Sequence, residues 1–496
     1  MRHPPLLLAV EVLGLVAFVA LATFRVFETR VTGAERIPLT AEALATGPSA
    51  ERWNGVFFED QHVGFTVNRT TPVAGDGRLY ESRSSFRIAS FGQLQDVVTA
   101  GAALTDGGGQ LRQFDFFMTA GGVRLVARGE VSGNLITMEV DQAGETTQLE
   151  FPVTDPPHVS LSLEDAIRRT ELSVGTAFTV PYFDPVTLSQ GEMTLRVEGI
   201  EVVGNGEEAY WIRSRMGDIE TRALVLPTGE TLRQEGALGM SLVRMTAEEA
   251  TDIPTADAPV DLISLSAVSL VGTLSSPRDL DRIVLHIQGV DPERIRHEPP
   301  LQVREGDRVT VSMPMLLEMP TLPVASDDDA DEVWLSSTPT LPVHHLEINE
   351  RAVSVVGDAA DRKEAVKRLV DFVYGYVEKV PSVGVPNGLS VLRSAQGDCN
   401  EHTALFVSLA RSVGIPARIA AGVVYSDRVG PRGAFYYHAW PEVRLGGPTD
   451  WVPVDPTFGQ MPADATHVKI VEGDLDRQVE IMGVLGRLGF TLIEPR

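Results

Sequence analysis

The sequence is poor in cysteine and in positive charge. Among 496 residues, Cys399 is the only cysteine, so the chain can form no internal disulfide and no metal site built from several thiolates. Its 42 Lys and Arg are outnumbered by 68 Asp and Glu, which gives a formal net charge of -26. Binding to a nucleic-acid backbone needs a basic surface, so we expect no nucleic-acid partner. A lone cysteine is commonly a small buried hydrophobe, and the role of Cys399 therefore depends on its neighbours.

One long apolar run is present, at residues 6–24. A helix of roughly 20 residues crosses a bilayer, and this run is about long enough. The small residues near its end make a poor cleavage site, which favours an uncleaved signal anchor over a removed signal peptide. Arg2 precedes the run and Arg25 and Arg30 follow it, so positive charge does not decide its orientation. We expect residues 1–30 to be a single-pass membrane anchor, with the main domains in the periplasm or otherwise outside the cytoplasm.

The chain is too long for one core, and its composition divides it into several parts. Residues 50–250 alternate apolar and polar side chains between glycine-containing turns, which predicts an antiparallel β-rich domain. A stretch rich in Asp, Pro and Ala at residues 251–259 marks a linker, and residues 260–345 predict a small β module. The module carries an acidic loop at residues 326–332. This loop lacks the glycine and the distal glutamate of an EF-hand, so we expect a solvated loop rather than a calcium site.

Helical periodicity begins in the C-terminal third, and one predicted helix places Cys399 at its start. Asp398 and Glu401 have the spacing of a capping box, and apolar residues follow on one face from Leu405 onwards. Cys399 is then the first helical residue, where the helix end favours a thiolate while the charge of Asp398 opposes it. A structural cysteine would be expected on the apolar face, for example at Leu409. This position indicates a functional thiol.

A thiol nucleophile needs a base, and the base needs a third group to orient it. Residues 417–425 and 435–443 are predicted strands, and a third strand is predicted to begin at Trp451. If the last two strands pair as a hairpin, His438 and Asp455 lie side by side at the end of the sheet. Either residue alone is ordinary, because histidines are common in cores and Asp before Pro is common in turns. Together with Cys399 they form a candidate triad.

Four blocks of sequence carry a resemblance to a known family, and they occur in the family's order. They are Gly397-Asp398-Cys399, Gly414-Ile415-Pro416-Ala417-Arg418, His438-Ala439-Trp440-Pro441-Glu442-Val443 and Trp451-Val452-Pro453-Val454-Asp455-Pro456-Thr457. This segment resembles the transglutaminase-like superfamily, which has a papain-like cysteine fold. The resemblance implies an α+β catalytic domain at residues 346–496, with Cys399 as nucleophile, His438 as general base and acid, and Asp455 as the group that orients the imidazole. No cofactor or metal is implied.

The whole chain is thus expected to be multidomain, with a transmembrane helix, antiparallel β-rich domains and a C-terminal papain-like domain. The triad implies an enzyme that forms a thioester acyl-enzyme from amide bonds or glutamine side chains of a protein or peptide. Protease or amidase activity and transamidation differ only in whether water or an amine resolves the thioester, and both stay open. The alternative is a non-catalytic envelope scaffold or binding protein with the same fold, because most of the chain precedes the enzyme-like segment.

Overall fold

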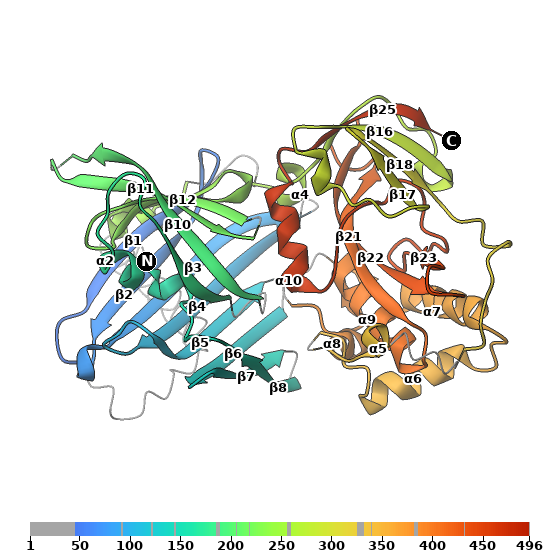
Figure 1. Ribbon diagram of the computed structural model, residues 1–496, viewed down its shortest axis with the longest axis horizontal. Helices are drawn as coiled ribbons and strands as arrows, with labels where there is room; N and C mark the ends of the chain where they lie inside the picture. Colours follow the sequence, from blue (N-terminus) through green and yellow to red (C-terminus); the bar gives the residue numbers. More distant parts are fainter. Residues whose placement is uncertain are drawn as a thin grey trace, which may run out of the picture.

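The computed structural model describes residues 45–495 apart from short gaps, and Figure 1 shows the arrangement of their elements. The gaps are residues 91–92, 121–122, 143–144, 185–188, 205, 218, 255–258, 325–331, 339, 381–384 and 431. The expected membrane anchor at residues 1–30 lies outside the described residues, as does most of the acidic loop. Within the described ranges, no helix is both long enough and apolar enough to cross a membrane.

The N-terminal half is one antiparallel sheet of 14 strands, which confirms the predicted β-rich region. The strands are β1 (Ala50–Phe58), β2 (Gln61–Pro72), β3 (Arg78–Ser90), β4 (Gln93–Thr105), β5 (Leu111–Ala120), β6 (Val123–Ser132), β7 (Leu135–Gln142), β8 (Glu145–Pro152), β9 (Ala177–Asp184), β10 (Ser189–Val202), β11 (Glu208–Met216), β12 (Ile219–Val225), β13 (Thr231–Glu235) and β14 (Met240–Met245). The order in the sheet is β8 to β1 followed by β14 to β9. The chain therefore crosses from one edge to the other after β8, and its return brings β14 beside β1.

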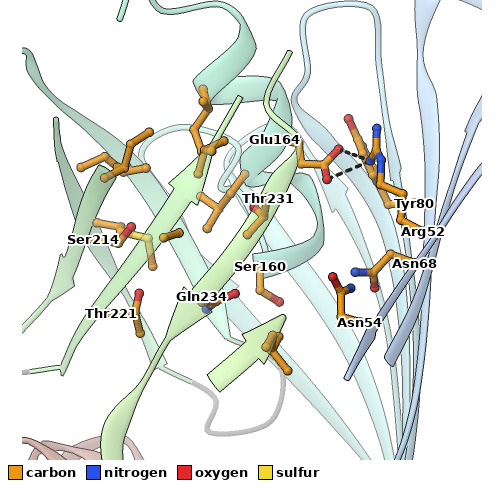
Figure 2. A pocket seen from close by; sticks show the side chains of 18 of the residues that line it. Arg52, Asn54, Asn68, Tyr80, Ser160, Glu164, Ser214, Thr221, Thr231 and Gln234 are labelled. Atoms are coloured by element: carbon orange, nitrogen blue, oxygen red, sulfur yellow. Dashed lines mark hydrogen bonds and ion pairs between the residues drawn. The ribbon is translucent and has the colours of Figure 1, made fainter. Parts of the chain in front are cut away.

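The two halves of the large sheet face each other across a cavity of about 290 Å³. Asn54 and Asn68 line it from β1 and β2, and Ser214 lines it from β11, as Figure 2 shows. The short helix α2 (Leu163–Arg168) closes part of the cavity, and its Glu164 accepts hydrogen bonds of 3.0 Å from Arg52. All lining residues fall between residues 52 and 244, so this cavity is separate from the candidate triad.

A second sheet has five strands in the order β15-β25-β16-β18-β17. Its strands are β15 (Ser269–Val271), β16 (Arg282–Gln288), β17 (Gln302–Glu305), β18 (Arg308–Ser312) and β25 (Gly489–Pro495). The sequence predicted a β module confined to residues 260–345, and the structure differs because the C-terminal strand β25 lies between β15 and β16. β25 is parallel to β15 and antiparallel to β16, so it supplies the pairing that the short β15 and the edge of β16 need.

The third part is α+β, with four main helices packed on a four-stranded antiparallel sheet (Figure 1). The helices are α6 (Leu346–Val356), α7 (Arg362–Tyr376), α8 (Gly388–Ser394) and α9 (Cys399–Ser412), and the sheet is β23 (Trp451–Pro453), β22 (Ala434–Arg444), β21 (Ala417–Ser426) and β24 (Val468–Glu472). One apolar core lies between the helices and the sheet, and a second core lies between the sheet and the five-stranded module. The sheet is therefore covered on both faces, and α9 is buried along most of its length.

Beside five further 3₁₀ turns that lie before residue 295, several short elements connect these parts of the described chain. They are α3 (Ala247–Thr251), α4 (Leu262–Leu265), α5 (Glu332–Leu335), α10 (Leu475–Gln478), the paired strands β19 (Glu378–Lys379) and β20 (Gln396–Gly397), and the 3₁₀ turn η7 (Val479–Gly483). η7 contacts β12, and Val385 packs against Met118 and Leu125 of the large sheet. The large sheet thus lies against the α+β part near the segment that precedes α8.

Candidate active site

Cys399 is the first residue of α9, as the capping pattern predicted. The Asp398 carboxylate accepts a hydrogen bond of 2.9 Å from the Asn400 amide, and Glu401 accepts one of 2.9 Å from the Asp398 amide. These bonds satisfy N–H groups that a helix start leaves without intrahelical partners. A Cβ atom at Gly397 would lie 2.2 Å from the Cβ of Glu401, so the close approach that forms this cap requires glycine. The local structure therefore explains why Gly and Asp precede Cys399 in this block.

The surroundings of the thiol raise its pKa well above the ordinary value. Burial of the sulfur contributes most, although Cys399 as a whole residue is partly exposed, and the charge of Asp398 adds to it. The backbone amide of Ala439 on β22 acts in the opposite direction. The Thr403 hydroxyl donates to the Ala439 carbonyl at 3.1 Å, which joins α9 to β22 at the residue after His438. A thiol with a raised pKa needs a base to become a nucleophile at neutral pH.

His438 lies on β22 with only 1% of its surface exposed. Its Nε2 donates to the Asp455 carboxylate at 2.9 Å. Its Nδ1 has no hydrogen-bond partner within the described part of the chain, so Cys399 is not hydrogen-bonded to the imidazole in this structure. The ring is held between Phe458, at a centroid distance of 5.0 Å, and Trp440, at 6.1 Å. This packing fixes the plane of the imidazole.

Asp455 is fully buried just beyond β23. β22 and β23 pair with Arg444 opposite Trp451, and this hairpin brings Asp455 back to His438 as predicted. Its Oδ1 accepts backbone N–H groups from the next turn, and its Oδ2 accepts the His438 bond. Burial alone would raise the pKa of Asp455, but the charges and hydrogen bonds of two histidines hold it well below its usual range. Asp455 is therefore a carboxylate, His438 is protonated on Nε2, and Nδ1 carries a lone pair.

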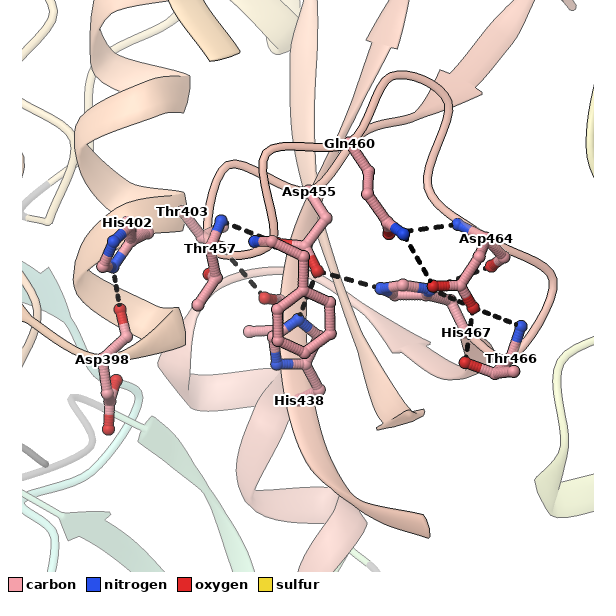
Figure 3. A network of polar contacts seen from close by, with 12 residues as sticks. Asp398, His402, Thr403, His438, Asp455, Thr457, Gln460, Asp464, Thr466 and His467 are labelled. Atoms are coloured by element: carbon pink, nitrogen blue, oxygen red, sulfur yellow. Dashed lines mark hydrogen bonds and ion pairs between the residues drawn. The ribbon is translucent and has the colours of Figure 1, made fainter. Parts of the chain in front are cut away.

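The second histidine on Asp455 is His467, which sequence reasoning missed. Its Nε2 lies 3.0 Å from the same Oδ2, and its Nδ1 lies 2.9 Å from the main-chain oxygen of Asp464, as Figure 3 shows. Burial acts to lower the pKa of His467, but Asp464 and Asp455 outweigh it and raise the pKa to about 9. No motif in the sequence marks His467, because it follows Asp455 in an irregular loop.

Among the residues that the structure describes, two groups of side chains have a spacing that a metal ion could use, and both already make other contacts. In the first group, His438 and His467 each hydrogen-bond to Oδ2 of Asp455. The second group is the three glutamates Glu298, Glu442 and Glu472, where the Lys469 ammonium lies within 3.1 Å of all three. In the first group the Nε2 atoms of both histidines turn hydrogens toward the carboxylate, where a metal ion would need lone pairs.

Two residues in the family-like blocks have a structural rather than a chemical role. The Arg418 guanidinium pairs with Glu442 at 2.7 Å and with Glu472 at 2.8 Å, and it lies over the Trp451 ring at 4.1 Å. All four residues belong to the four-stranded sheet, at β21, β22, β24 and β23. These contacts account for the Arg and the Glu in the blocks near the candidate triad, which neither residue touches.

Residues 349–456 match the family model of the transglutaminase-like superfamily. The C-terminal region contains a transglutaminase-like domain. The matched range includes Cys399, His438 and Asp455 and ends before His467. No curated protein matches the chain.

Solved structures that are similar to the chain cover different shares of it. A protein provisionally named a cysteine protease, from Cytophaga hutchinsonii, is 16% identical and covers 43% of this chain and 86% of its own, with a TM-score of 0.27. A β-barrel-like protein of unknown function from Brucella abortus is 11% identical and covers 41% and 97%, with a TM-score of 0.33. A protein provisionally named a protease, from Parabacteroides distasonis, is 10% identical and covers 70% and 69%, with a TM-score of 0.20.

Proposed function

We propose that the transglutaminase-like domain is a cysteine acyl-transfer enzyme that acts on amide bonds or glutamine side chains of a protein or peptide. Cys399 is the nucleophile, His438 the general base and acid, and Asp455 the group that orients the imidazole. The observation that carries this proposal is the state of His438. Its Nε2 donates to a buried carboxylate, while its buried Nδ1 carries a lone pair and has no hydrogen-bond partner among the described residues. A core histidine with only a packing role has no need for such an atom.

The reaction follows from these protonation states. Nδ1 of His438 accepts the thiol proton as the Cys399 sulfur attacks the amide carbonyl, and a carbon–sulfur bond forms. The imidazolium then gives this proton to the leaving nitrogen as the carbon–nitrogen bond breaks, which leaves a thioester. Water or an amine loses a proton to Nδ1 as it attacks the thioester, and the released sulfur takes that proton back. The charged imidazolium in each step is stabilised by the Asp455 carboxylate.

The oxyanion of the tetrahedral intermediate needs donors near the sulfur. The backbone N–H of Cys399 belongs to the first turn of α9, where N–H groups have no intrahelical acceptor. The positive end of the helix dipole points to the same place. We assign this N–H as one oxyanion donor, which would stabilise the intermediate without any movement of the backbone.

The test is the rate at which Cys399 in the full chain reacts with a peptide-like electrophile. Because Cys399 is the only cysteine, labelling by itself proves nothing, and the informative variant is His438→Gln. General base catalysis contributes about 10²–10⁴-fold, so we expect His438→Gln to slow labelling by about 100-fold or more. The matched control is His286→Gln, which replaces a partly exposed histidine on β16 and should leave the rate unchanged. Equal rates in the two variants would overturn the proposal and favour a non-catalytic scaffold.

We also propose that residues 1–30 anchor the protein in a membrane with its described domains outside the cytoplasm. The support is the apolar run at residues 6–24, which is about long enough to span a bilayer. The full chain should remain in the membrane fraction after washing at high salt and high pH, while a chain that begins at residue 45 should be released. Release of both chains would contradict the anchor.

A further inference from the structure

Both ring nitrogens of His467 face hydrogen-bond acceptors. Nδ1 lies 2.9 Å from the main-chain oxygen of Asp464, which can only accept. Nε2 lies 3.0 Å from Oδ2 of Asp455. That carboxylate also accepts from His438 and from the backbone amides of Thr457 and Phe458, so four donors surround it and it has no need of a proton of its own. The geometry therefore requires a hydrogen on each nitrogen of His467, which makes the ring a cation.

The charges that face this cation come from several elements. Asp455 follows β23, and His438 lies on β22 with its ring centroid 5.5 Å from that of His467. The Asp464 side chain is 3.6 Å from Nδ1, and it pairs at 2.7 Å with Arg278 from the module segment before β16. Two buried anions thus face two cations. Without the charge of His467, this buried cluster would carry a net negative charge beside the triad.

We propose that His467 is a positioning residue, a permanent imidazolium that fixes Asp455 as a carboxylate aimed at His438 and offsets its charge. The inference rests on the proposed function of the triad and deepens it. His467 touches no reacting atom and acts through Asp455. Its bond to Oδ2, the oxygen that His438 also uses, keeps the Asp455 carboxylate from rotating away. Its charge limits how far the carboxylate raises the pKa of His438.

The same cation affects the nucleophile. A nearby positive charge favours the deprotonated form of an acid, so His467 acts to lower the pKa of both the Cys399 thiol and the His438 imidazolium. Asp455 and Asp398 act on the thiol in the opposite direction. Loss of the positive charge should therefore raise both pKa values. For His438, at the 5.5 Å separation of the two rings and the effective dielectric of a protein, the shift is about 1 pH unit or more.

The test uses His467→Gln in the full chain, with the rate of iodoacetamide reaction at Cys399 measured against pH and without substrate. We expect the acid limb of this profile to move up by about 1 pH unit. The matched control is again His286→Gln, which should not move the limb. A purely structural role would lower the rate equally at every pH, and a variant profile that keeps its wild-type midpoint would overturn the inference.

A second measurement does not depend on the variant folding well. In the wild-type chain with ¹⁵N-labelled histidine, both ring nitrogens of His467 should give the signals of protonated nitrogens throughout the neutral pH range. A neutral tautomer would overturn the inference. Failure of the proposed function would give a different result. His438→Gln would then leave the alkylation rate unchanged while His467 remained doubly protonated.

Discussion

At the residue scale, the reactivity of Cys399 is a balance between charges of opposite sign. Burial and the carboxylate of Asp398 raise the pKa of the thiol, while the helix end and the Ala439 amide act to lower it. The side chain of Asp398 also caps α9, so it has a structural role. The same carboxylate destabilises the thiolate because of its negative charge.

Asp398→Asn separates these two roles. Asparagine caps helices about as well as aspartate, so the stability of α9 should change by less than about 0.5 kcal/mol. Removal of an anion beside an acid lowers the pKa of that acid, so the acid limb of Cys399 alkylation should move to lower pH, opposite to the shift expected for His467→Gln. The measurement is the pH profile of alkylation beside a thermal unfolding curve. A limb that moves upwards would show that Asp398 does not destabilise the thiolate.

At the element scale, a buried ionic cluster ties three strands of the transglutaminase-like domain to the neighbouring module. Arg418 on β21 and Lys469 on β24 face Glu442 on β22, Glu472 on β24 and Glu298 from the segment before β17. Removal of one member of such a cluster leaves the other charges buried and unpaired. Substitutions in this cluster therefore measure how much it stabilises the sheet that carries His438.

Lys469→Met should lower the free energy of unfolding by about 3–5 kcal/mol, because three glutamates would then share one cation. The matched control is Lys367→Met, which removes an exposed i,i+4 pair with Asp371 on α7 and should cost less than about 1 kcal/mol. Urea denaturation of both variants measures the difference. Equal losses would show that the cluster contributes no more to the stability of the fold than an exposed ion pair does.

At the scale of the whole molecule, the C-terminal strand joins parts of the chain that are far apart in sequence. β25 completes the five-stranded sheet, and its Phe490 is fully buried in the core between that sheet and the transglutaminase-like domain. Phe435 on β22 packs edge-to-face on Phe490 at a centroid distance of 5.1 Å. The last residues of the chain therefore support the sheet from which His438 projects.

Phe490→Ala should cost about 3–5 kcal/mol in the free energy of unfolding, since it leaves a cavity in a closed core. Ile493→Ala on the same strand is the control, because that side chain is 49% exposed and its loss should cost less than about 1 kcal/mol. The readout is the unfolding transition together with the rate of Cys399 labelling. A Phe490→Ala variant as stable as the control would mean that β25 is dispensable to the domain.

The sequence by itself determined the elements whose signals are local. The capping pattern at Asp398 and Glu401 placed Cys399 at the start of α9. Strand-like runs on either side of a turn-rich loop predicted β21 and β22, and the alternation of side chains predicted the antiparallel strands of the N-terminal half. The pairing of His438 with Asp455 was also predictable, because a short hairpin fixes the register of its two strands. Such features depend on residues a few positions apart, and the types of these residues determine the local backbone structure.

Only the tertiary structure decided the contacts made across long separations. The pairing of β1 with β14, the place of β25 in the module and the contact of Glu298 with Arg418 depend on how separate segments pack. His467 is the clearest case, because nothing near it in sequence distinguishes it from a surface histidine. Its charge and its role follow from two acceptors that the folded loop places at opposite ends of one ring.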